Sequence, residues 1–371
     1  MSIAILLAFS SLSQQAPQIN NDVAYHFNRA VELQRKGELK EAAAEYRAAL
    51  ALAPNYAEAE ANLGAVLARI GDYDGAVTAY ESALRLKPEL TPVLLNLGIA
   101  RYRSGQFEKA TEVLERFLAV EPDHTQARQL LGVSLVELGR DADAITYLEP
   151  ALQSPQAEST ALYSLGLAYL RLRRGDAGDV ARRLAAREDG AALAHLLQGQ
   201  ADLEALAFEK AAVELEAAAK LSADLPRIHF LLGLAYFKLG RLPEARERLE
   251  REINRDPDDF LSLYYLASLL EKQNDLDSAV RRIEAALAQQ PQSVEALTLA
   301  GSVYFKQGRT VEAVRVLERA TQKLPDNSEA RYLLARAYQK MGRKQEAARE
   351  FKEVERLKAQ ANNREKERKP N

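Results

Sequence analysis

The side chains that could support catalysis or metal binding in this sequence are few. Cysteine is absent, and the histidines number four: His26, His124, His195 and His229. Without cysteine the chain has no thiolate nucleophile, disulfide or cysteine-based metal site. The sequence also contains no phosphate-binding loop, nucleophile elbow or dinucleotide fingerprint. We therefore expect a protein that is not an enzyme, with no catalytic residue, no cofactor and no bound metal.

A second group of residues could recognise a protein without making or breaking bonds. Three asparagines recur at intervals of 34 residues in the N-terminal half, namely Asn28, Asn62 and Asn96. An amide side chain both donates and accepts hydrogen bonds, so such a row could hold the backbone of an extended peptide. The alternative is that these asparagines are ordinary polar surface.

Aromatic and lysine side chains recur with the same interval in the C-terminal half. The aromatic residues offer contact area at low entropic cost; they are Phe230, Phe237, Tyr264, Phe305 and Tyr332. The lysines that accompany them are Lys238, Lys272, Lys306 and Lys340. Together they favour a peptide or helix that is both acidic and hydrophobic. The alternative is that the rings pack against neighbouring repeats and the lysines are simply solvated.

The interval of 34 residues belongs to a repeat that occupies most of the chain. A small residue recurs at this interval, with one step of 33, at Ala30, Gly64, Gly98, Gly132, Gly166, Gly199, Gly233, Ala267, Gly301 and Ala335. Another small residue follows each of these after twelve positions. Two small residues in register allow two helices to pack closely. Each unit is therefore predicted to be a helical hairpin.

Turn residues mark where the helices of each hairpin end. Most units carry Gly or Asn seven residues after the first small residue, and both residue types tolerate the left-handed backbone conformation that closes a helix. Arg173 and Leu206 replace that residue in the fifth and sixth units, and the fifth unit is one residue short. We expect residues 173–210 to be irregular, with a longer turn around Gly175 to Gly178 and a shortened second helix in the fifth unit.

These features resemble the tetratricopeptide repeat family, whose 34-residue unit has the pattern L-G-x-x-Y, A-x-x-x-F and P. The segment "NLGAVLARIGDYDGAVTAYESALRLKP" follows that pattern closely. Ten units fit, beginning at Val23, Ala57, Thr91, Thr125, Ser159, Ala192, Pro226, Phe260, Val294 and Ser328. The resemblance implies an all-α, right-handed superhelical solenoid of tandem helical hairpins. It also places the asparagines, aromatic residues and lysines named above on the concave surface.

The resemblance and the composition together define the expected organisation and function. We expect a signal peptide and linker at residues 1–22, the solenoid at 23–361 and a charged tail at 362–371. The net charge of −3 does not indicate nucleic acid or an anionic membrane as a partner. We expect a scaffold that binds a peptide or helix of a partner protein. The alternative is an accessory repeat subunit of an envelope glycosyltransferase, secretion or assembly machine whose catalytic part is another chain.

The N-terminal residues predict export to the periplasm or cell envelope of a bacterium. An apolar run from Ile3 to Phe9 is followed by small residues at Ser11 and Ser13, an arrangement similar to a secretory signal with its cleavage site. The run is too short for a membrane-spanning helix, which needs about 20 residues. Against export, no Lys or Arg precedes the run, and the alternative is a cytoplasmic chain with a frayed start.

Export predicts that the mature chain is shorter than the sequence. N-terminal sequencing of the protein purified from its native cells should give a start at or near Gln14, because cleavage would follow the small residues. A chain that begins at Met1 or Ser2 would instead support the cytoplasmic alternative.

Overall fold

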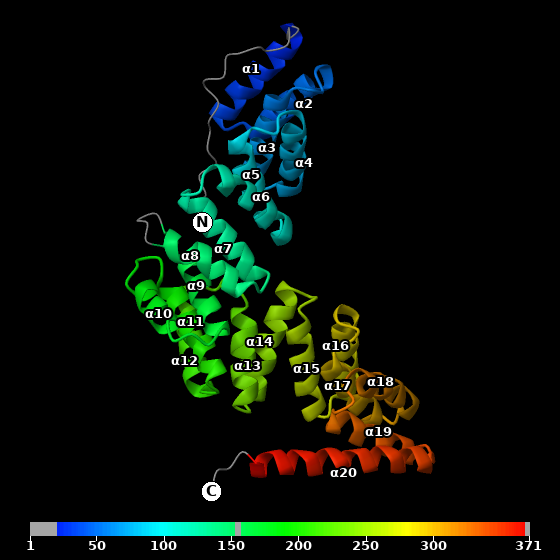
Figure 1. Cartoon of the computed structure of the whole chain (residues 1–371). Coiled ribbons are helices and arrows are strands. Elements are labelled where there is room, and N and C mark those ends of the chain that lie inside the picture. Colours follow the sequence, from blue (N-terminus) through cyan, green and yellow to red (C-terminus); the bar gives the residue numbers. More distant parts are fainter. Residues whose placement is uncertain (1–20, 153–156, 368–371) are drawn as a thin grey trace. The chain divides into compact units, whose positions relative to one another are not determined.

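The computed structural model describes residues 21–152 and 157–367, and these residues form twenty α-helices in tandem (Figure 1). No strand occurs within these two ranges. The predicted all-α class is therefore confirmed, and the twenty helices make ten hairpins. The predicted signal peptide falls on residues 1–20, outside the described residues, as do the last four residues of the predicted charged tail.

The first helix of each hairpin is called its A helix. The A helices are α1 (Asn21–Lys36), α3 (Ala57–Ile70), α5 (Thr91–Arg103), α7 (Thr125–Glu137), α9 (Ser159–Arg171), α11 (Ala191–Glu204), α13 (Ile228–Lys238), α15 (Phe260–Lys272), α17 (Val294–Lys306) and α19 (Ser328–Lys340).

The second helix of each hairpin is called its B helix. The B helices are α2 (Leu39–Leu52), α4 (Tyr73–Leu86), α6 (Phe107–Val120), α8 (Asp141–Ala151), α10 (Ala177–Ala185), α12 (Phe208–Leu221), α14 (Leu242–Arg255), α16 (Leu276–Gln289), α18 (Thr310–Lys323) and α20 (Lys344–Glu367). The last of these continues past residue 361, where the repeat pattern ends, and its backbone is helical through Glu367.

Where the small residue that defines the repeat is glycine, the A helix approaches its own B helix closely at that residue, although in the fifth repeat Gly166 lies even closer to Leu197 of the next A helix. A β-carbon placed on Gly132 of α7 would lie 2.4 Å from Cγ of Leu148 on α8, and one placed on Gly301 of α17 would lie 2.4 Å from Cγ of Leu317 on α18. Real β-carbons do not approach other atoms so closely. The glycine is therefore what allows a B-helix leucine to pack against the A-helix backbone.

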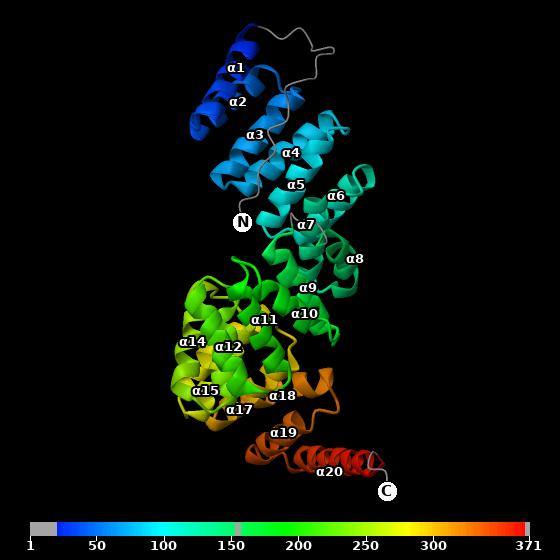
Figure 2. The same cartoon turned by 90° about the vertical axis from the view of Figure 1, so that its left-hand side faces the viewer.

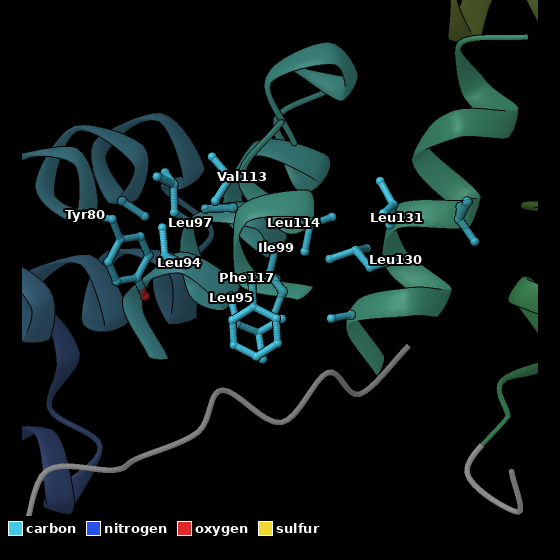
Figure 3. Packing of buried hydrophobic residues seen from close by; sticks show 14 of the residues in the cluster. Tyr80, Leu94, Leu95, Leu97, Ile99, Val113, Leu114, Phe117, Leu130 and Leu131 are labelled. Atoms are coloured by element: carbon cyan, nitrogen blue, oxygen red, sulfur yellow. The ribbon is translucent and has the colours of Figure 1, made fainter. Parts of the chain in front are cut away.

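The chain divides into two compact units, one up to Leu197 and one from Gln198 onward. Within the first, hairpins built from α3, α4, α5 and α6 pack against one another in sequence (Figures 1 and 2). Figure 3 shows their core, where Tyr80 of α4, Leu97 of α5 and Leu114 of α6 are buried together. This stacking is expected, because one hairpin cannot bury both of its apolar faces.

Neighbouring repeats are also joined by a recurring set of polar contacts. A tyrosine on an A helix donates its hydroxyl to a glutamate 20 residues earlier, on the preceding B helix, and an arginine five residues later lies over the tyrosine ring. In the second unit, the Tyr304 hydroxyl lies 2.7 Å from Glu284 and the Arg309 guanidinium lies 4.5 Å from the ring centroid. Burial, and then the hydrogen bond to Glu284, raise the pKa of Tyr304 to about 12. The same contacts recur at Tyr169, Tyr236 and Tyr338.

The fifth hairpin has a short B helix: α10 has 9 residues where most B helices have 14. The connection before it covers residues 172–176, so Gly178, which is predicted to lie in the turn, instead lies within α10. Hydrogen bonds join the segment after α10 to the start of α9. Arg187 donates to the Ala157 carbonyl at 2.9 Å and to the Ser159 hydroxyl at 2.7 Å, and Ser159 in turn donates to Asp189 at 2.7 Å.

The glycines predicted to close the A helices adopt positive φ angles, from 71° at Gly139 to 92° at Gly71. At the irregular positions the backbone conformation is the same although the residue is not glycine. Arg173 has φ 55° and Leu206 has φ 58°. The Leu206 amide donates to the Leu203 carbonyl, and the next amide donates to the Asp202 carbonyl. These hydrogen bonds hold leucine in a backbone conformation that favours glycine.

Replacing Leu206 by glycine should therefore stabilise the second unit. Relief of the left-handed strain predicts that Leu206→Gly raises the free energy of unfolding by about 1 kcal/mol, measured by urea unfolding followed by circular dichroism. Leu206 is 71% exposed, so little packing is lost. The control is Leu206→Ala, which keeps the β-carbon and should give no such gain. Equal stability of the two variants would show that the left-handed backbone at residue 206 is not strained.

Candidate functional site

The candidate site lies on the A helices of the second unit. Helix α13 contacts α15, α15 contacts α17, and α17 contacts α19. Their exposed or partly exposed rings and cations, here called the A-helix face, are Phe237, Lys238, Tyr264, Tyr265, Lys272, Phe305, Lys306, Tyr332, Arg336 and Lys340. All of these side chains are partly or largely exposed. The face is therefore accessible to a partner.

Aromatic rings form the apolar part of this face, and Tyr265 lies at their centre. Its ring centroid lies 5.5 Å from that of Phe237 on α13 and 5.3 Å from that of Tyr264. Tyr264 in turn stacks on Phe260, with centroids 6.2 Å apart. Tyr265 is not among the site residues predicted from the sequence. Its position in the repeat could have identified it, because the first three repeats carry Asn28, Asn62 and Asn96 at the same position.

Cations lie over these rings. The Lys272 ammonium is 4.8 Å from the Phe237 centroid, and the Lys238 ammonium is 6.0 Å from that of Tyr265. Lys340 and Arg336 lie 5.1 Å and 5.3 Å from the centroid of Phe305.

Among the ion pairs of the described residues, none involves Lys238, Lys272, Arg336 or Lys340. Contacts between cations and rings at exposed positions contribute about 0.5–1 kcal/mol each. They orient the cations without neutralising their charge.

Lys306 is the exception among the four lysines. Its ammonium lies 3.0 Å from the carboxylate of Glu271, which also accepts a hydrogen bond from Ser302 at 2.5 Å. Three of these four lysines contact a residue 35 positions earlier, on the preceding A helix. Lys272 meets Phe237 there, Lys340 meets Phe305 and Lys306 meets Glu271. The residue found there decides whether the lysine keeps an unbalanced charge.

Two of the sequence-predicted aromatic residues have different surroundings from the rest. Phe230 is 5% exposed, its amide donates to Glu252 at 3.1 Å and the guanidinium of Arg227 covers its ring at 4.4 Å. It therefore packs inside the unit and is not available to a partner. Tyr332 is 43% exposed and rests on Phe351 of α20, with centroids 6.1 Å apart.

The three asparagines of the first unit lie on α1, α3 and α5, at the same point of each A helix. Asn28 is exposed, and Asn62 and Asn96 are partly buried. The Tyr46 hydroxyl donates to Gln34 at 2.7 Å. Burial raises the pKa of this hydroxyl, and the neighbouring Asn62 side chain lowers it. Asn62 therefore lies next to a buried polar group of its own unit.

The histidines show no arrangement for metal binding. Within residues 21–152 and 157–367, no group of three or more His, Asp or Glu side chains could hold a metal ion. His26 pairs with Glu45 at 2.6 Å, and His124 accepts the Ala127 amide at the start of α7. His229 is partly buried, and no hydrogen-bond partner lies near its Nδ1. The described helices also include none that is long and apolar enough to cross a membrane.

Comparison with known proteins gives matches to repeat families. Models described as tetratricopeptide repeats match residues 27–90, 63–133, 102–165 and 226–259, and one described as TPR repeat matches 199–240. A model described as anaphase-promoting complex, cyclosome, subunit 3 matches residues 254–354. No curated protein matches the chain.

Several solved structures are similar to the chain. One is yeast Tom70, at 14% identity and a TM-score of 0.42, covering 90% of this chain and 92% of that one. Another is MamA, residues 41 to the end, from Desulfovibrio magneticus RS-1, at 20% identity and a TM-score of 0.43, covering 46% of this chain and 96% of that one. A further MamA structure has 21% identity and a TM-score of 0.41, covering 44% and 96%.

The surroundings of His229 predict that the second unit loses stability in mild acid. Burial, and then the charges of Arg248, Arg251 and Arg255, lower the pKa of this histidine below its ordinary value. Above about pH 6.5 the histidine is neutral in both states. As the pH falls below that value, the unfolded chain binds the proton more readily, so the free energy of unfolding decreases until the pH passes the folded-state pKa.

The measurement is urea unfolding at pH 7.5 and pH 5.0 for the wild type and for His229→Leu. Leucine stands at the same place of the repeat at Leu263 and Leu297, so the variant should fold. The variant should lose less stability than the wild type between the two pH values. An equal loss would contradict the role of His229.

Proposed function

Because this chain belongs to the tetratricopeptide repeat family, we propose that it is a non-enzymatic scaffold that binds a peptide or helix of another protein on the A-helix face. The repeats and the tandem hairpins support a role in protein–protein interaction. That a partner protein binds, that it is acidic and apolar, and that it binds on this face are all proposed. The expected location outside the cytoplasm also remains a prediction, based on residues 1–13.

One observation carries this proposal: exposed rings and cations without carboxylate partners occupy the same face. Exposed aromatic side chains supply the contact area that dominates many interfaces. In the described part of the chain, no ion pair balances the charges of Lys238, Lys272, Arg336 and Lys340. A partner with carboxylates and apolar side chains would supply both missing contacts.

The A-helix face is a better candidate than other exposed apolar positions of the second unit. Val213 on α12 is 66% exposed and Val311 on α18 is 57% exposed, but each is an isolated side chain on a B helix. Single exposed apolar residues are common on protein surfaces and do not indicate a binding site. On the A-helix face, by contrast, the rings of α13 and α15 contact one another and lie beside Lys238 and Lys272. The Phe305 ring on α17 lies beside cations of α19.

The proposal predicts that a partner can be crosslinked from this face in cells. A photoreactive phenylalanine derivative is placed at Tyr332 or at Gln339, which occupies the repeat position of Phe305, in the chain expressed at its native level. Both residues are exposed on α19. One dominant protein adduct should form at both positions. The matched controls carry the same residue at Val213 or Val311 and should not give that adduct. Equal labelling from all four positions, or none from α19, would reject the proposed function.

A further inference from the structure

The A-helix face differs from the corresponding surface of the first unit in its capacity for hydrogen bonds. At the point where α1, α3 and α5 carry asparagine, α15, α17 and α19 carry Tyr265, Leu299 and Leu333. The nearby Ser302 hydroxyl is already bonded to Glu271. An extended peptide on this face would therefore leave many of its amide and carbonyl groups without partners, which is costly where water is excluded. A helix satisfies these groups internally.

The recurrence of the lysines, one on each A helix, suits such a helix. Each of the four A helices contributes one lysine, and packed helices lie about 8–10 Å apart. Seven residues of an α-helix rise about 10.5 Å and make nearly two full turns, so residues i, i+7, i+14 and i+21 lie on one side at about this spacing. A helix that crosses α13, α15, α17 and α19 would thus place one such residue near each lysine.

The four positions are not electrostatically equal. The lysines on α13, α15 and α19 have no carboxylate partner, whereas Lys306 on α17 is paired with Glu271, which is itself only 13% exposed. A carboxylate of the partner placed there would meet a charge that is already neutralised and would lie close to a second carboxylate. The third position along the face therefore favours an uncharged residue.

We infer that the A-helix face takes an amphipathic acidic helix whose carboxylates lie at i, i+7 and i+21, with an uncharged residue at i+14 and apolar side chains between them on the rings. The inference rests on the proposed function and deepens it, because it names the conformation and the charge pattern of the partner. The direction of the bound helix follows from the same pattern. Its two closely spaced carboxylates meet Lys238 and Lys272, and its distant one meets Lys340.

Synthetic 24-residue peptides test this inference on the full chain by fluorescence anisotropy. The test peptide has an alanine-rich helical background, leucines at i+3, i+4, i+10, i+11 and i+18, and glutamates at the three predicted positions. One control peptide moves the glutamates by two residues, which is about 200° around the helix. A second carries two interior prolines, which break the helix, and a third is a proline-rich extended chain with glutamate at every third residue. The test peptide should bind at least tenfold more tightly than each control.

Variants of the protein locate the bound peptide. Lys238→Gln, Lys272→Gln and Lys340→Gln combined should weaken binding about tenfold, because three exposed ion pairs are lost. The matched control combines Lys220→Gln and Lys323→Gln, two exposed lysines on the B helices α12 and α18, and should bind normally. Circular dichroism confirms that both variants are folded.

A change of specificity gives the sharpest readout. Glu271→Gln releases Lys306, so a peptide with a fourth glutamate at i+14 should bind this variant several-fold more tightly than it binds the wild type. A folding defect would weaken binding instead. Tighter binding of the extended peptide, an unchanged affinity in the triple lysine variant, or no gain in Glu271→Gln would each overturn the inference. If these outcomes occur while crosslinking from α19 still succeeds, the acidic-helix inference fails and the scaffold function stands.

Discussion

The structure depends on the close approach of two helices at one small residue in each repeat. A β-carbon at Gly64, Gly132 or Gly301 would lie less than 3 Å from a side chain of the B helix, so a larger residue would force the hairpin apart. Separated helices would lose the packing that buries B-helix residues such as Leu148 and Leu317 completely. The position of the A helix, and therefore of every residue on its outer side, follows from this contact.

A second constraint is that each hairpin is stabilised mainly by its neighbours. The contact of tyrosine, glutamate and arginine joins a B helix to the next A helix at Tyr236, Tyr304 and Tyr338. Such contacts between adjacent repeats make stability close to a sum of local terms. They also hold successive A helices in register, so rings and cations that are 34 residues apart in sequence form one surface.

The period predicts the repeats well because it reflects backbone geometry, which depends on small residues and turns more than on their surroundings. Exposure is harder to predict. Phe230 and Phe237 lie seven residues apart on one helix, yet Arg227 and Glu252 enclose the first while the second stays partly exposed. Likewise, the sequence identifies Arg173 as a departure from glycine, but the backbone keeps its left-handed turn because the flanking helices require it.

Contacts that reach back 35 residues, from one A helix to the preceding one, differ between the two units. In the first unit, Arg69 and Arg171 donate to the backbone carbonyls of Gln34 and Val136, which joins neighbouring repeats. In the second unit, Lys272 and Lys340 meet phenylalanine rings instead. A ring orients an ammonium group but carries no net charge to neutralise it, so the positive charge remains available to an acidic partner.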